Sequence, residues 1–196
     1  MAADIREKII AEALHEINRR GADFHMDDLA RNLRISKRTL YEHFSSKQEI
    51  IEKSMLSLID DIHEQHVALL ANTEMTTEEK IINFFNVKTH YISVLSVRKT
   101  DEILRKMPEV CAALEERRRM DWALLSQLFE QAQQEDSFKE VDKFLLIHML
   151  HSASDDILEY FDESEHESSF SEYMEKCIRV ILYGANLQYK CNTYKK

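Results

Sequence analysis

Residues 26–47 read MDDLARNLRISKRTLYEHFSSK and carry two short helical patterns separated by a tight turn. The first pattern covers 26–33 and opens with two aspartates, where negative charge suits a helix N-terminus. Ser36 is a good N-cap for the second pattern, 37–44, in which Leu40 and Phe44 are four residues apart and face the core. This arrangement predicts a helix-turn-helix, although plain helical hairpins that do not bind DNA have the same spacing.

The chain on either side of this stretch has the composition of an all-α protein. Its 196 residues contain 2 glycines and 1 proline, too few to punctuate many strands or turns. An apolar stripe at four-residue spacing predicts a first helix over 4–20, followed by Gly21. We expect about nine helices: an N-terminal three-helix helix-turn-helix DNA-binding domain over 1–47, and a helical ligand-binding and dimerisation domain over 48–196. The later helices are expected at 47–71, 76–97, 101–106, 109–134, 141–161 and 168–189.

The charge distribution is compatible with DNA binding, although the net charge is −10. Residues 1–55 carry equal numbers of basic and acidic side chains, so the excess acid belongs to residues 56–196. Within 31–47 basic side chains outnumber the single acid, Glu42; they are Arg31, Arg34, Lys37, Arg38 and Lys47. A local basic surface on an acidic body allows phosphate contacts at one place, whereas uniform acidity would repel DNA everywhere.

Several other classes of protein are disfavoured by the sequence. No apolar run approaches the roughly 18 residues of a membrane span, and the charged N-terminus does not resemble a signal peptide, so we expect a cytoplasmic protein without a membrane partner. Two glycines cannot build a phosphate-binding loop, and no nucleophile has a recognisable base partner, so we expect neither an enzyme nor a cofactor. His148, His151 and Asp155 share a helical face that could bind a metal, but chance pairs are expected among nine histidines, and we predict no metal site.

The segment 26–47 also resembles the signature of the tetracycline-repressor-like (TetR/AcrR) family of transcriptional regulators. The matching positions, in order and spacing, are Ser36, Thr39, Leu40, Tyr41, His43, Phe44 and Lys47. The resemblance covers about a quarter of the chain and implies a DNA-binding head on a helical effector domain. Two positions depart from it: Arg34 replaces the usual turn glycine, which implies a strained or altered turn, and His25 replaces the usual Thr or Ser cap.

The expected DNA contacts come from the second helix and the residues after it. The N-terminal residues of such a helix reach base edges in the major groove, so Lys37 and Arg38 are candidates to read guanine, and Glu42 could accept from a cytosine amino group. The resemblance places Tyr41 and Lys47 on backbone phosphates, and Thr39 can donate to phosphate as well. His43 and Glu42 are read equally well as DNA contacts or as solvated side chains.

We expect a ligand-responsive transcriptional regulator, a homodimeric repressor released from its double-stranded operator by a small molecule. The alternative is a helical small-molecule-binding module without sequence-specific DNA recognition. The apolar run 144–150 and an apolar ridge on the last helix predict the dimer interface; the ridge is Phe170, Met174, Cys177, Ile181 and Ala185, with Gly184 allowing close approach. Candidates to line an effector cavity, or else to fill the core, are Phe85, Tyr91, Trp122, Phe129 and His148.

Overall fold

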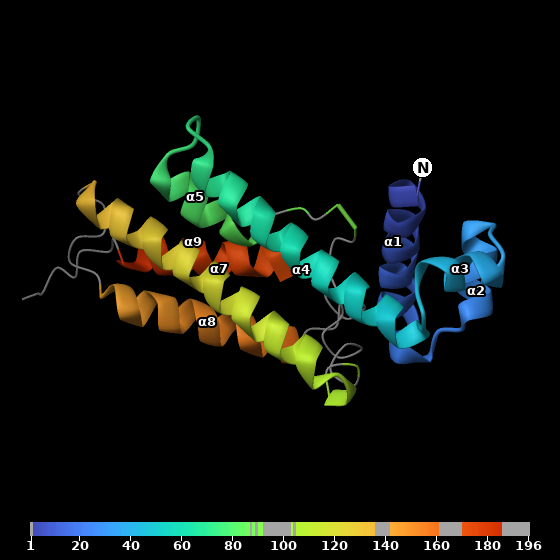
Figure 1. Cartoon of the computed structure of the whole chain (residues 1–196). Coiled ribbons are helices and arrows are strands. Elements are labelled where there is room, and N and C mark those ends of the chain that lie inside the picture. Colours follow the sequence, from blue (N-terminus) through green and yellow to red (C-terminus); the bar gives the residue numbers. More distant parts are fainter. Residues whose placement is uncertain are drawn as a thin grey trace, which may run out of the picture.

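The computed structural model describes residues 2–86, 88, 90, 91, 103, 105–135, 142–160 and 170–185, and within them all regular structure is helical. Three helices form a head on the right of Figure 1: α1 (Ala2–Arg20), α2 (Met26–Leu33) and α3 (Lys37–His43). Four form a body on the left: α5 (Thr77–Asn83), α7 (Pro108–Gln134), α8 (Lys143–Tyr160) and α9 (Phe170–Ala185). The helix α4 (Lys47–Ala71) runs from the head into the body. The all-α fold with an N-terminal helix-turn-helix is confirmed.

The head is organised by the apolar stripe of α1. Ile9, Ala13 and Ile17 are fully buried and pack against Leu29 of α2 and Leu40 of α3. The helix α1 ends at Arg20, and Gly21 follows with φ 63, the left-handed conformation that a glycine adopts without strain. A short 3₁₀ helix, η1 (Gly21–Asp23), then leads into α2.

The first half of α4 belongs to the core of the head. Ile50, Met55 and Leu58 pack in the same cluster as α1, and this cluster extends to Met107 and Val110 at the start of α7. The division expected at residues 47 and 48 coincides with the start of α4, but the packing of Ile50 to Leu58 makes α4 common to both units. A continuous helix therefore connects the head to the body without a linker.

The body has a separate core, formed by buried residues such as Phe84, Leu125, Leu150 and Ile178. Its first helix, α5, begins with a capping box in which the Thr76 side chain accepts the Glu79 N–H while the Glu79 carboxylate accepts the Thr76 N–H.

The predicted continuation of α5 to residue 97 is wrong within the described residues. The helix ends at Asn83, a 3₁₀ turn, η2 (Phe84–Asn86), follows, and His90 and Tyr91 lie in a bend. The Phe84 carbonyl accepts from His66 Nε2 at 3.0 Å, and the two rings stack at 4.0 Å, so a tertiary contact fixes the turn. Residues 92–97 and most of the predicted helix at 101–106 lie outside the described residues.

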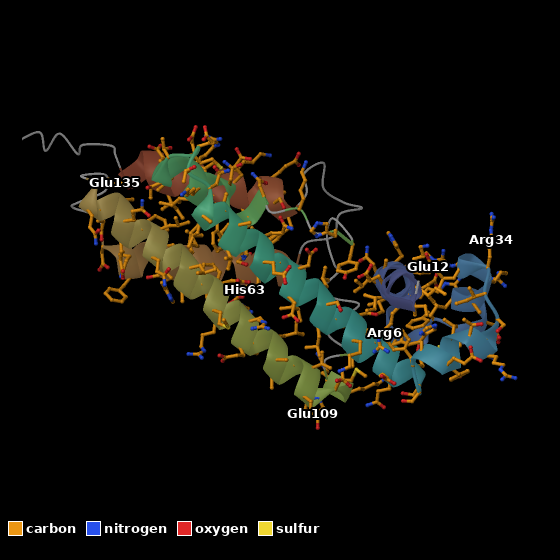
Figure 2. The ribbon with its side chains drawn as sticks, turned by 45° about the horizontal axis from the view of Figure 1, so that its top comes forward. Arg6, Glu12, Arg34, His63, Glu109 and Glu135 are labelled. Atoms are coloured by element: carbon orange, nitrogen blue, oxygen red, sulfur yellow. The ribbon has the colours of Figure 1, made fainter. Side chains whose placement is uncertain are left out.

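A polar cluster is buried where α4 crosses α7. Asp121 of α7 is 9% exposed, and its Oδ1 lies 2.6 Å from His63 Nδ1 and 3.2 Å from His66 Nδ1. Nearby, Arg117 of α7 reaches Asp60 of α4 at 2.7 Å on the exposed edge of the same contact. The two helices are thus joined by polar contacts both inside and outside their interface (Figure 2 labels His63).

The helices α8 and α9 pack their most apolar faces on the body core, which corrects part of the expected dimer ridge. Met174 is fully buried inside the subunit, together with Ile178 and Leu182, because these three side chains form the face of α9 that meets the core. The apolar side chains left exposed are others: Phe144, Leu145 and Met149 on α8, and Val180 on α9. No helix in the described part of the chain is long and apolar enough to cross a membrane.

Candidate nucleic-acid interface

The helix α3 is built to hold one face in the core and present the other to solvent. The Ser36 side chain accepts the backbone N–H of Thr39 at 3.0 Å and begins the helix, as predicted. Leu40 is fully buried and Phe44, which follows the helix, is 1% exposed, so both are core residues as expected. Lys37, Arg38, Tyr41 and Glu42 are all exposed. The predicted base-reading and phosphate-contacting side chains therefore share the outer face of α3.

The two candidate base-reading cations each have an acidic partner in the free protein. Lys37 Nζ lies 2.8 Å from an oxygen of Asp27 in the first turn of α2, and this hydrogen-bonded carboxylate raises the pKa of Lys37. Arg38 Nε lies 3.0 Å from Glu42 one turn later on α3. Both pairs are largely exposed and hold little energy, so a DNA phosphate or base edge can compete for either cation.

Three further predicted contacts occupy different positions around α3. Tyr41 is 49% exposed, which leaves its hydroxyl accessible. Thr39 is half-buried, and its Oγ1 lies 2.9 Å from Ser36 Oγ, so its hydroxyl already takes part in the cap. His43 is half-buried at the last position of α3, and its carbonyl accepts from Arg6 at 2.8 Å.

Lys47 is half-buried and bound within the head. Its Nζ donates to the Ala22 carbonyl at 2.5 Å and lies 4.5 Å from the centre of the Phe24 ring. Burial is the main cause that lowers the pKa of Lys47. The side chain thus ties the start of α4 to η1, while the phosphate contact implied by the family resemblance stays a prediction.

Sequence reasoning missed Arg6, which clamps the end of the recognition helix to α1. Its guanidinium donates to the His43 carbonyl, lies 4.3 Å from the centre of the Phe44 ring, and approaches Glu49 at 3.9 Å. Glu49 in turn accepts the Ser45 hydroxyl at 2.7 Å and the Ser45 N–H at 2.6 Å, and these hydrogen bonds lower its pKa. The Ser45–Glu49 spacing was readable as a local cap, but nothing local connects Arg6 to a residue 37 positions away.

The five predicted effector-lining residues do not surround one cavity. Phe85 and Trp122 are in contact, with ring centres 5.7 Å apart, and Phe129 is 1% exposed within the body core. His148 is exposed on α8, because its face of that helix is turned away from the core. Tyr91 packs against the head cluster instead of lying on α5.

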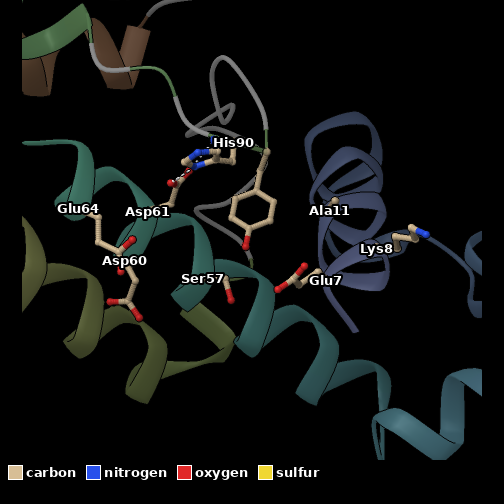
Figure 3. Close-up of a pocket in the computed structure, with 9 residues that line it drawn as sticks. Glu7, Lys8, Ala11, Ser57, Asp60, Asp61, Glu64 and His90 are labelled. Atoms are coloured by element: carbon tan, nitrogen blue, oxygen red, sulfur yellow. Dashed lines mark hydrogen bonds and ion pairs between the residues drawn. The ribbon is translucent and has the colours of Figure 1, made fainter. Parts of the chain in front are cut away.

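Tyr91 lines an open cleft of about 580 Å³ between α1 and the middle of α4 (Figure 3). Burial is the main cause that raises the pKa of its hydroxyl. Beside it, the buried carboxylate of Asp61 accepts the backbone N–H of His90 at 2.6 Å. The other lining residues are Glu7, Lys8, Ala11, Asp60 and Glu64. The cleft therefore touches the head and the helix that leaves it.

The His148–His151–Asp155 face is occupied by protein contacts. Asp155 pairs with His151 at 3.0 Å and with Arg118, and Arg118 is 3.2 Å from His151 Nε2. Among the described residues no group of three or more His, Cys, Asp or Glu side chains could hold a metal ion.

Comparison with known proteins agrees with this arrangement of head and body. The sequence profile of the bacterial regulatory proteins of the tetR family matches residues 9–53, which span α1, the helix-turn-helix and the start of α4. Residues 9–53 therefore match the DNA-binding head of tetR-family regulators. The protein is a DNA-binding transcriptional regulator, and this head is the part that carries the candidate interface.

Similar proteins extend the TetR-family likeness over most of the chain. The HTH-type transcriptional regulator YvaF of Bacillus subtilis (strain 168) is 22% identical over 178 residues, which cover 91% of this chain and 94% of that protein. The TetR-family regulator PfmR of Thermus thermophilus has a TM-score of 0.68 at 22% identity, covering 89% of this chain and 97% of its own. The regulator FadR of Bacillus subtilis, solved in complex with stearoyl-CoA, has a TM-score of 0.60 at 15% identity, covering 91% of this chain and 98% of its own. At these identities the structural likeness is one of fold.

Proposed function

We propose that this protein is a homodimeric repressor that binds a double-stranded DNA operator through α3 and leaves it when a small molecule binds. The observation that carries the proposal is the exposed face of α3, where Lys37, Arg38 and Tyr41 stand over the buried anchors Leu40 and Phe44. A helix held in this way can enter the major groove without rearranging the core of the head. Glu42, Thr39, His43 and Lys47 complete the proposed DNA-contacting set.

Selection of bound fragments from a genomic library tests sequence recognition and supplies the operator. With that operator, Arg38→Ala is expected to cost about 1–3 kcal/mol and to relax the preference at one base position. The matched control is Arg119→Ala, which removes an exposed arginine paired with Glu116 on α7, outside the helix-turn-helix. Equal binding by both variants, or selection that enriches no sequence, contradicts the proposal and favours a ligand-binding module without DNA recognition.

The dimer is proposed to form through α8 and α9. Phe144 and Val180 are 79% and 72% exposed, although both are large apolar side chains on helices whose opposite faces fill the body core. A second copy of the chain would cover them, and two-fold symmetry would set two α3 helices about 34–36 Å, or a multiple of it, apart on DNA.

Sedimentation of the wild type is expected to show a dimer at micromolar concentration, and a Phe144→Glu, Val180→Glu double variant is expected to sediment as a monomer. Since both positions are exposed within the subunit, the variant should keep its helical circular dichroism. A Val67→Glu variant on α4, which changes another exposed apolar residue, is the control. A monomeric wild type removes the dimer from the proposal.

The effector is proposed to be a hydrophobic or amphipathic small molecule. The aromatic contact of Phe85 with Trp122 in the body supports an apolar ligand, and the cleft beside Tyr91, whose lining is mainly charged, is the second place at which a ligand could bind. An inducer must bind the DNA-free form more tightly, so its affinity must fall when the operator is present. Thermal-shift hits should therefore be repeated with operator, and with Trp122→Phe and Tyr91→Phe, to show which place responds. Hits that are indifferent to operator contradict induction.

A further inference from the structure

The turn of the helix-turn-helix contains a strained arginine. Arg34 follows the last residue of α2 with φ 55 and ψ 38, in the left-handed region. Its N–H donates to the Arg31 carbonyl at 3.1 Å, and the Ile35 N–H donates to the Ala30 carbonyl at 3.0 Å. This pair of hydrogen bonds is the Schellman motif, which requires a left-handed residue at the position of Arg34. A side chain with a Cβ is disfavoured there, so the backbone conformation favours glycine over arginine.

The end of α1 provides an internal comparison. Gly21 occupies the equivalent position after Arg20, with φ 63, and it is buried. The head therefore uses glycine at one left-handed helix end and arginine at the other, at similar values of φ. The difference is that Arg34 is exposed, so its side chain extends into solvent.

The guanidinium of Arg34 is free in the part of the chain that the structure describes, where it has no hydrogen bond or ion pair. Neighbouring cations of the motif are bound: Arg31 to Asp28, Lys37 to Asp27, and Lys47 to the Ala22 carbonyl. Figure 2 shows Arg34 at the outer edge of the head, directed away from the ribbon. Strain retained at an exposed, unpaired residue within a binding motif indicates a function that the free protein does not reveal.

We propose that Arg34 contacts a backbone phosphate of the operator beside the groove that α3 enters. The inference rests on the proposed DNA recognition by α3, because Arg34 lies two residues before the Ser36 cap and so at the end of α3 that points into the groove. The guanidinium fork matches phosphate geometry and carries a charge at every physiological pH. The contact positions the head on the duplex and carries no base preference.

Arg34→Gly separates this role from a structural one, because stability and DNA affinity should move in opposite directions. Relief of the left-handed strain is expected to raise Tm by about 2–4 °C in a chain of this length. Loss of one phosphate contact is expected to reduce the slope of log K against log salt by about 0.9. The ratio of wild-type to variant affinity for DNA should therefore fall about 3.5-fold between 50 and 200 mM salt. Operator and unrelated duplexes should lose affinity alike.

Two further variants of Arg34 and one control variant complete the test. Arg34→Lys keeps the charge and should restore most of the slope, whereas Arg34→Asn, which tolerates the left-handed conformation without charge, should behave like Arg34→Gly. Arg119→Ala removes an exposed arginine outside the helix-turn-helix and should leave the slope unchanged. The inference alone is overturned if the wild type recognises its operator but Arg34→Gly keeps the wild-type slope. If the wild type prefers no DNA sequence, the proposed function itself fails.

Discussion

Replacing Asp121 with alanine is expected to weaken the junction between α4 and α7 much more than replacing its exposed neighbour. His63 Nδ1 lies 2.6 Å from Asp121 Oδ1 and loses this partner in the variant, although its side chain is only 18% exposed. His66 Nδ1 lies 3.2 Å from the same oxygen, and its side chain is 7% exposed. His66 Nδ1 has no hydrogen-bond partner even with Asp121 in place, so the loss falls on His63. Leaving this mostly buried group without its partner costs about 2 kcal/mol, which lowers Tm by about 4–8 °C in a chain of this length.

The matched control is Asp60→Ala, which breaks the other polar contact between the same two helices. The Asp60–Arg117 pair has side chains 50% and 38% exposed, so its loss should cost about 0.5 kcal/mol and lower Tm by about 1–2 °C. Thermal unfolding followed by circular dichroism measures both variants. A double-mutant cycle with His63→Ala isolates the pairwise energy. Equal Tm values for Asp121→Ala and Asp60→Ala, or full additivity in the cycle, would refute the reasoning.

Three further expectations concern the head. Asp27→Asn frees Lys37 and should tighten operator binding about two- to fivefold in fluorescence anisotropy; weaker binding would mean that the pair positions Lys37 for DNA. Ser36→Ala removes the cap of α3 and should lower the free energy of unfolding by about 1 kcal/mol in urea titration, with Ser36→Gly losing less; the reverse order would contradict the capping role. The hydrogen bond from Arg20 is the main cause that holds the pKa of Asp28 below its ordinary 3.8, so this carboxylate stabilises the head above that value and stops doing so as the pH falls through the lowered pKa. Asp28→Asn should therefore weaken the dependence of the free energy of unfolding on pH below about pH 4. The same pH dependence in the variant and in the wild type would exclude this contribution.

The parts of the fold that sequence predicts well depend on neighbours within one helical turn. Ser36 caps its helix and Leu40 lies in the core as expected, because caps and apolar spacing act over three or four residues. The capping box of Thr76 and Glu79 has the same local range. The strained turn at Arg34 follows in the same way, since the end of α2 needs a left-handed residue wherever α3 restarts so soon.

What sequence could not predict depends on contacts between distant segments. The early end of α5 reflects the stacking of Phe84 on His66, and the clamp of Arg6 on His43 joins residues on two helices. The face of α9 that meets the core could not be separated from a partner-facing ridge, because both are apolar and have the same helical period. Likewise, the pairing of Lys37 with Asp27 depends on the angle between α2 and α3, which residue spacing does not specify.

The continuity of α4 restricts how such a regulator can be rebuilt. Its 25 residues form an uninterrupted helix about 37 Å long. The number of residues in this helix therefore sets the rotation of the head relative to the body. A single inserted residue would turn the head by about 100° and advance it by about 1.5 Å relative to the body. A chimera that joins this head to a related body must therefore align α4 residue for residue, since an offset would leave both halves folded but aim the recognition helix away from the groove.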